Sequence, residues 1–189
     1  MKTRLLINGR LVNEGKIFDA DLLIEGDRIA KVESGLAASI ADEVIDLNGK
    51  YLLPGLIDDQ VHLREPGLTH KASIASESKA AISGGVTSFM DMPNTKPPTT
   101  TRRALAEKKA LAAGRSFANY AFYLGATNNN IEEIRRLTPG EACGVKVFMG
   151  SSTGDMLVDD PRKLEQIFSE ASCLVATHCE DTPMIRAAE

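Results

Sequence analysis

The sequence predicts an α/β protein: about the first five strands of a TIM-like (β/α)8 barrel, preceded by a small N-terminal β segment. Three observations support this fold class. Residues 1–53 contain short β-like runs and few helix signals. From residue 54 onward, apolar strand-like runs alternate with helical stretches, as in a parallel sheet buried on both faces. Polar residues recur where these strand runs end, and a barrel builds its active site at that edge.

The N-terminal segment has three β-like runs, at residues 4–12, 19–33 and 43–53. Asn-Gly, Glu-Gly-Asp and Asn-Gly-Lys turns join or interrupt these runs. Such turns favour hairpins because Gly and Asn tolerate positive φ. We therefore expect a small antiparallel sheet that is too rich in edges to be stable alone.

Five strand runs and four helical stretches follow. The strand runs lie at 56–62, 85–92, 119–126, 143–149 and 173–178, and the helical stretches at 70–83, 100–113, 129–137 and 160–171. Thr69, Thr99 and either Asp159 or Asp160 are the expected caps near three helix starts. An open doubly wound sheet would usually carry a glycine-rich phosphate turn, which this sequence lacks. Because a barrel needs eight strands, we expect the 189 residues to be an incomplete portion of one.

Composition restricts the class of protein. The formal net charge of -4 gives no reason to expect a nucleic-acid partner, which requires a basic surface. The apolar runs are too short to span a membrane, and the N-terminal apolar run is too short for a signal peptide. We therefore expect a cytoplasmic protein that acts on a small molecule.

The three cysteines, Cys143, Cys173 and Cys179, lie in or beside apolar runs. Their odd number and their spacing argue against a disulfide framework and against a zinc site. We expect reduced thiols that pack as small apolar side chains.

The first barrel strand carries alternating polar residues, Asp58, Gln60, His62 and Arg64, and then stops at a Pro-Gly pair. Residues two apart in a strand share a face. A carboxylate, an amide, an imidazole and a guanidinium are therefore expected on one face, at the end of one strand. This pattern predicts a functional site.

Asn94, Lys146 and His178 also lie at or near strand ends, one or two β/α units apart. Imidazoles such as those of His62 and His178 suit zinc and similar metals. The ammonium of Lys146 is costly to bury between two valines and would tend to lose its proton. A neutral lysine amine can take up carbon dioxide, and the resulting carbamate can bridge two metal ions.

Each of these residues also has a structural explanation. Lys146 could reach solvent or pair with an acid. Arg64 could pair with Glu65, and Asn94 could simply form a turn after Pro93. Either histidine alone would more often be a hydrogen-bonded core residue. Asp155, in a polar loop on the same side, is expected to be a solvated carboxylate, and His70 a surface residue.

Six short motifs carry a resemblance to a known family. They are Pro54-Gly55-Leu56-Ile57-Asp58, His62-Leu63-Arg64-Glu65-Pro66-Gly67, Gly84-Gly85-Val86-Thr87, Met92-Pro93-Asn94-Thr95, the strand around Lys146, and Thr177-His178-Cys179-Glu180. In this order and spacing the sequence resembles the amidohydrolase superfamily and, within it, the dihydroorotases. By this resemblance, residues 1–53 correspond to the family's β-sandwich segment and residues 54–189 to the N-terminal part of its metal-dependent barrel.

The resemblance implies a zinc-dependent enzyme that reversibly hydrolyses the cyclic amide of dihydroorotate to N-carbamoyl-aspartate in pyrimidine biosynthesis. His62 and His178 would bind one or two zinc ions, and Lys146 would be the carboxylated bridging ligand. Arg64 and Asn94 would bind the substrate carboxylate. An amidohydrolase for another cyclic amide is the alternative within the family.

Two departures from the family pattern set further expectations. Gln60 replaces the first histidine of the usual His-x-His pair, so the number of bound metals depends on this altered ligand position. The family's aspartate general acid/base is expected beyond Glu189, so no catalytic residue is assigned within the chain. We expect the 189 residues alone to be inactive. The alternative is a catalytically silent scaffold for a partner such as aspartate transcarbamoylase, and a homo-oligomer is a further possible assembly.

Overall fold

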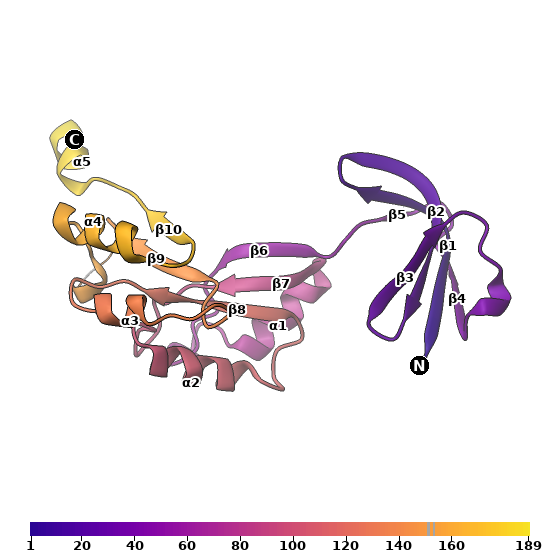
Figure 1. Ribbon diagram of the computed structural model, residues 1–189, viewed down its shortest axis with the longest axis horizontal. Helices are drawn as coiled ribbons and strands as arrows, with labels where there is room; N and C mark the ends of the chain where they lie inside the picture. Colours follow the sequence, from indigo (N-terminus) through magenta and orange to yellow (C-terminus); the bar gives the residue numbers. More distant parts are fainter. Residues whose placement is uncertain (151, 153) are drawn as a thin grey trace. The chain divides into compact units, whose positions relative to one another are not determined.

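The computed structural model describes residues 1–150, 152 and 154–189. The chain divides into two compact units, Met1–Gly55 and Leu56–Glu189 (Figure 1). Among the described residues, no helix is both long and apolar enough to cross a bilayer.

The first unit is one five-stranded mixed sheet around a long central strand. Its strands are β1 (Thr3–Asn13), β2 (Lys16–Glu25), β3 (Arg28–Glu33), β4 (Glu43–Asp46) and β5 (Tyr51–Leu52), with the short helix η1 (Ala38–Ile40) before β4. β1 pairs antiparallel with β2 but parallel with both β4 and β5. The expectation of a purely antiparallel sheet is therefore wrong. At 11 residues, β1 is long enough to pair with two short strands that the intervening chain brings to it in parallel.

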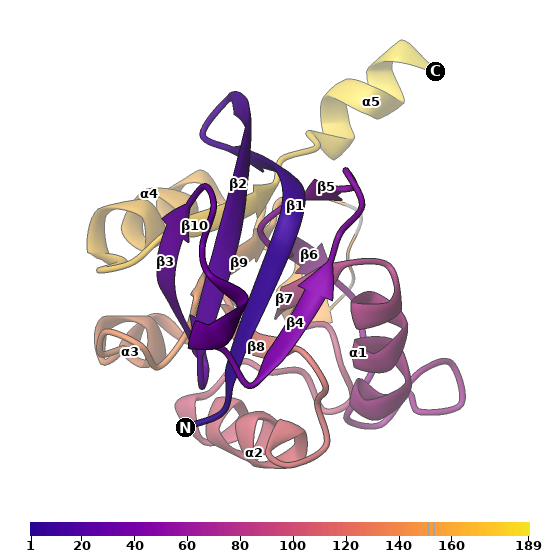
Figure 2. The same cartoon turned by 90° about the vertical axis from the view of Figure 1, so that its right-hand side faces the viewer.

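The second unit is a curled parallel sheet with its five strands in chain order, which confirms the predicted fold class. The strands are β6 (Leu56–Val61), β7 (Val86–Asp91), β8 (Asn119–Gly125), β9 (Gly144–Phe148) and β10 (Val175–His178). The helices are α1 (Ile74–Ser83), α2 (Arg102–Ala112), α3 (Ile131–Arg135), α4 (Pro161–Glu170), α5 (Thr182–Ala188) and the short η2 (Gly154–Met156). Figures 1 and 2 show α1 to α4 following one face of this sheet.

Local capping decides where the helices begin. The Ser73 hydroxyl accepts a hydrogen bond from the Ser76 amide and forms a capping box, so α1 starts at Ile74 rather than after Thr69. Thr101 caps α2 in place of the expected Thr99, whose side chain is buried. Asp160 caps α4 as predicted, and its carboxylate accepts from the Arg162 amide.

The core of the second unit lies between the sheet and its helices. Its buried apolar residues are Leu63, Ile74, Phe89, Leu105, Ala112, Ala118, Phe122, Leu124, Ala126, Ile134, Leu137, Val145, Val147, Val158 and Ile167. On β9, Val145 and Val147 belong to this core, so alternation places Lys146 on the opposite face of the sheet. A strand buried on both faces thus presents a lysine to the side away from the helices.

Replacing Phe122 with alanine tests this core. Phe122 has no exposed surface, so Phe122→Ala should lower the free energy of unfolding by about 3–5 kcal/mol. The matched control Phe117→Ala removes a ring that is 64% exposed and should change it by less than about 0.5 kcal/mol. Urea denaturation of the full-length protein gives both values. Equal shifts for the two variants would contradict the assigned core.

Candidate functional site

Parallel pairing brings the polar strand ends to one edge of the sheet. His62 directly follows β6, Asn94 lies in the loop after β7, Lys146 lies within β9, and His178 is the last residue of β10. All five strands run in the same direction, so their carboxyl ends share that edge. His62, Asn94 and His178 therefore lie at one end of the second unit, and Lys146 lies two residues before the end of its strand, in register with Ala176.

His62 and Asn94 are in direct contact across the ends of β6 and β7. Nδ1 of His62 lies 2.8 Å from Oδ1 of Asn94. With Nδ1 donating to this oxygen, Nε2 carries the lone pair, which is the state of imidazole that binds a metal. Burial lowers the pKa of His62 below its ordinary value, against the opposing effect of the Asn94 hydrogen bond. The half-buried ring therefore favours its neutral form.

Lys146 is 3% exposed, and its amine has no hydrogen bond or ion pair with a residue that the structure describes. Its Nζ lies 5.1 Å from the ring centroid of Phe148, two residues later on the same face. Burial lowers the pKa of Lys146 from its ordinary value. Neither structural explanation for this lysine, a solvated end or an acidic partner, is found among the described residues.

Phe148 also contacts His178. The two residues are paired in register between β9 and β10, and their rings stack with centroids 6.3 Å apart. One aromatic ring thus lies beside both Lys146 and His178. Nε2 of His178 lies 3.0 Å from Oε1 of Glu180, so a carboxylate is in contact with this imidazole.

Arg64 does not pair with Glu65. The Glu65 side chain is buried, accepts a hydrogen bond from the Ile74 amide at 2.9 Å and forms an ion pair with Arg115 at 2.9 Å. Arg64 has a left-handed backbone (φ 65), and its half-buried side chain has no hydrogen bond or ion pair with a described residue. Non-glycine residues with a left-handed backbone are strained, and such residues cluster at functional sites.

Gln60 and Asp58 are exposed on β6. The Asp58 carboxylate accepts from the backbone amide of Gln60 at 3.1 Å, so it supports the strand rather than another site side chain. β6 is the end strand of the sheet in this chain, which explains why both residues remain accessible.

Sequence reasoning missed a buried ion pair next to the site. Oδ2 of Asp91 lies 2.7 Å from Nζ of Lys108, and the two side chains are 0% and 1% exposed. Burial lowers the pKa of Lys108, and the Asp91 carboxylate opposes this shift. The sequence does carry a signal for this buried lysine. Lys108 lies three residues after Leu105 and four before Ala112, so it belongs to the buried face of α2.

Three further expectations concern the polar loop, the cysteines and His70. The polar loop 150–155 includes Ser151 and Thr153, which lie outside the described residues. All three cysteines are free, and burial raises the pKa of Cys143 to about 12, but Cys179 is exposed. The expectation of a core thiol is thus wrong for Cys179, because it follows the last residue of β10. His70 is exposed, as predicted.

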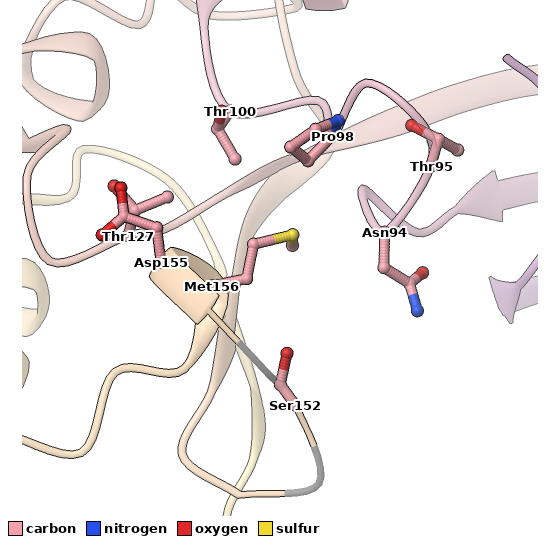
Figure 3. Close-up of a pocket in the computed structure, with 8 residues that line it drawn as sticks. All are labelled: Asn94, Thr95, Pro98, Thr100, Thr127, Ser152, Asp155 and Met156. Atoms are coloured by element: carbon pink, nitrogen blue, oxygen red, sulfur yellow. The ribbon is translucent and has the colours of Figure 1, made fainter. Parts of the chain in front are cut away.

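A cavity of about 490 Å³ opens beside Asn94 (Figure 3). Most of its lining side chains carry hydroxyl, amide or carboxylate groups. The lining consists of Asn94, Thr95, Pro98, Thr100, Thr127, Ser152, Asp155 and Met156. Asp155 is exposed and accepts a hydrogen bond from Asn129 at 3.1 Å, which agrees with a solvated loop carboxylate.

His62 and His178 could hold a metal ion if Lys146 were also one of its ligands. Among the described residues, no group of three or more His, Cys, Asp or Glu side chains could hold a metal ion. The candidate donors are instead two imidazoles and one buried amine without a described partner. Burial first, and then the positive charges of Arg64 and Lys146, keep the pKa of His62 below its ordinary value. As a carbamate, Lys146 would add the anionic oxygen that this set lacks.

The chain is similar to several cyclic amide hydrolases. Residues 51–184 match the Amidohydrolase family. The dihydroorotase of Pyrococcus horikoshii is 36% identical over 182 residues, covering 96% of this chain and 40% of that protein. The allantoinase of Deinococcus radiodurans is 34% identical over 172 residues, covering 88% of this chain and 38% of that protein. An L-hydantoinase (dihydropyrimidinase) structure from Arthrobacter aurescens has a TM-score of 0.91 at 33% identity, covering 99% of this chain and 43% of that one.

Proposed function

This chain belongs to the amidohydrolase family, and we propose that it supplies the metal-binding and carboxylate-binding strand ends of a dihydroorotase. The reaction would be the reversible hydrolysis of dihydroorotate to N-carbamoyl-aspartate in pyrimidine biosynthesis. The chain spans about 40% of the length of curated relatives that it matches, so the activity is proposed for the full-length protein. Relatives with three different names match at similar identity, so the choice of substrate rests on the site residues.

The observation that carries the proposal is that the Arg64 guanidinium has no hydrogen bond or ion pair with a described residue. Its neighbour Glu65 is already engaged by Arg115 and by the start of α1, which leaves the Arg64 side chain without this partner. A guanidinium in this state suits a carboxylate, which it can hold with two parallel hydrogen bonds. Dihydroorotate carries such a carboxylate beside its cyclic amide.

The cavity beside Asn94 supports a polar substrate. Thr95, Thr100, Thr127 and Ser152 contribute hydroxyl groups to its lining. Polar groups at a site favour ligands that pair with them, because an unpaired buried polar group is costly. A substrate with a charged or amide-bearing ring fits this lining better than one with an alkyl or aryl substituent.

His62, His178 and Lys146 would hold zinc, with Lys146 as its carbamate. Zinc in such a site acts as a Lewis acid that polarises a carbonyl and lowers the pKa of water. The protein's contribution is orientation. Asn94 fixes the imidazole of His62 by contact with Nδ1, and Phe148 lies against both Lys146 and His178.

Gln60 favours a second candidate function. An amide oxygen is a neutral and weaker zinc ligand than imidazole, so the position that Gln60 occupies would bind metal poorly. A catalytically silent scaffold for aspartate transcarbamoylase could carry such a replacement. Measuring bound zinc and dihydroorotate hydrolysis in the full-length protein separates the two candidates, because the scaffold predicts neither.

Arg64→Ala tests the carboxylate role. It should lower kcat/KM for dihydroorotate by about 30-fold, since charge-assisted hydrogen bonds contribute about 1.5–3 kcal/mol. Hydrolysis of an unsubstituted hydantoin, which has no carboxylate, should change little if it is detectable. Arg162→Ala is the matched control, because Arg162 has an 89% exposed side chain on α4. An unchanged kcat/KM for dihydroorotate in Arg64→Ala would rule out this role.

Gln60→His tests the altered ligand position. Restoring an imidazole should raise the zinc content of the dialysed full-length protein, measured by atomic emission, by up to one ion per chain. Gln166→His, on α4, controls for nonspecific binding by an added histidine. Equal zinc contents in the two variants would show that residue 60 does not determine the number of metals.

A further inference from the structure

We propose that the buried pair of Asp91 and Lys108 positions the site, by joining the two strand-end segments that carry His62, Arg64 and Asn94. This inference rests on the proposed function of those three residues. Asp91 and Lys108 are positioning residues, because they touch the backbone that carries the site rather than a substrate.

Asp91 reaches the end of β6 from the end of β7. Its Oδ1 accepts a hydrogen bond from the Leu63 amide at 2.8 Å. Leu63 stands between His62 and Arg64, so this single bond fixes the backbone that carries both. A second link, from the Met92 amide to the Val61 carbonyl at 2.9 Å, holds the same two strand ends together.

Lys108 reaches the same point from α2. Its Nζ lies 2.7 Å from Oδ2 of Asp91 and donates to the carbonyl of Met92 at 2.8 Å. Met92 lies two residues before Asn94, which contacts His62. The pair therefore joins one helix to both loops that meet in the His62–Asn94 contact.

Stability alone does not explain a buried ion pair. Removing two charges from water is expensive, and well-packed apolar residues of similar volume often stabilise a core at least as well. A buried charge pair is better suited to fixing one backbone geometry, since both ends must keep their partners. Here those partners are the Leu63 amide and the Met92 carbonyl.

Two double variants of the full-length protein separate positioning from stability. D91L/K108M replaces the pair with apolar side chains and removes the acceptor for the Leu63 amide. D91N/K108M removes the same charges but keeps an amide oxygen that can accept that bond. Lys109→Met is the control, because Lys109 is the next residue on α2 and its Nζ donates to the Gly140 carbonyl instead.

Hydrogen–deuterium exchange over residues 56–68 is the direct readout, because it does not depend on catalysis. D91L/K108M should exchange faster there than the wild-type protein, while D91N/K108M and Lys109→Met should not. In the zinc-loaded protein, kcat/KM for dihydroorotate should fall by about 100-fold in D91L/K108M, the effect of misplacing a group by about 1 Å. D91N/K108M should recover part of that loss.

Wild-type exchange and wild-type kcat/KM in D91L/K108M would overturn the proposal. If D91L/K108M does not fold, D91N/K108M serves as the test. Because this variant loses the Lys108 hydrogen bond to Met92, residues 86–95 should exchange faster than in Lys109→Met. Unchanged exchange over residues 86–95 would overturn the proposal. If the wild-type protein neither binds zinc nor hydrolyses dihydroorotate, the proposed function fails. The exchange comparison still decides whether the pair joins the two segments.

Discussion

The ion pair between Asp91 and Lys108 connects three elements at the point where the candidate site begins. It lies wholly inside the second unit, where the side chains are 0% and 1% exposed. Through the Leu63 amide it fixes the residue between His62 and Arg64, and through the Met92 carbonyl it fixes the approach to Asn94. The parallel hydrogen bonding of β6 with β7 brings the ends of these strands to one edge of the sheet. The Asp91–Lys108 ion pair then fixes the positions of these two ends relative to each other.

The alternation of side chains across β9 determines the other half of the site. Val145 and Val147 pack with the helices, so Lys146 must lie on the opposite face. In register pairing, Phe148 meets His178 on the next strand, and its ring also lies near Lys146. Strand periodicity and register therefore bring a lysine and a histidine to one aromatic ring, although they are distant in sequence.

The sequence allowed the barrel strands and the position of the polar strand ends to be predicted, because both follow from periodicity. Helix starts were less predictable, since Ser73 and Thr101 compete with equally plausible caps a few residues earlier. The parallel partners of β1 depend on a crossover that no local turn signal encodes.

Long-range pairing also limited what could be predicted at the site. The sequence around Glu65 does not show whether this carboxylate pairs with the adjacent Arg64 or with Arg115, which lies 50 residues away. Lys108 was missed for a similar reason, because a lysine on an amphipathic helix is normally solvated. Its partner Asp91 becomes apparent only when α2 packs against β8, which brings Lys108 to the end of β7.

We propose that these strand ends hold zinc with nitrogen and oxygen ligands. X-ray absorption spectroscopy of the zinc-loaded full-length protein tests it most directly. We expect the zinc to be surrounded by nitrogen and oxygen atoms at about 2.0–2.2 Å, with imidazole scattering at longer distance. Sulfur at about 2.3 Å, which would implicate an exposed thiol such as Cys179, or a protein that retains no zinc, would contradict it.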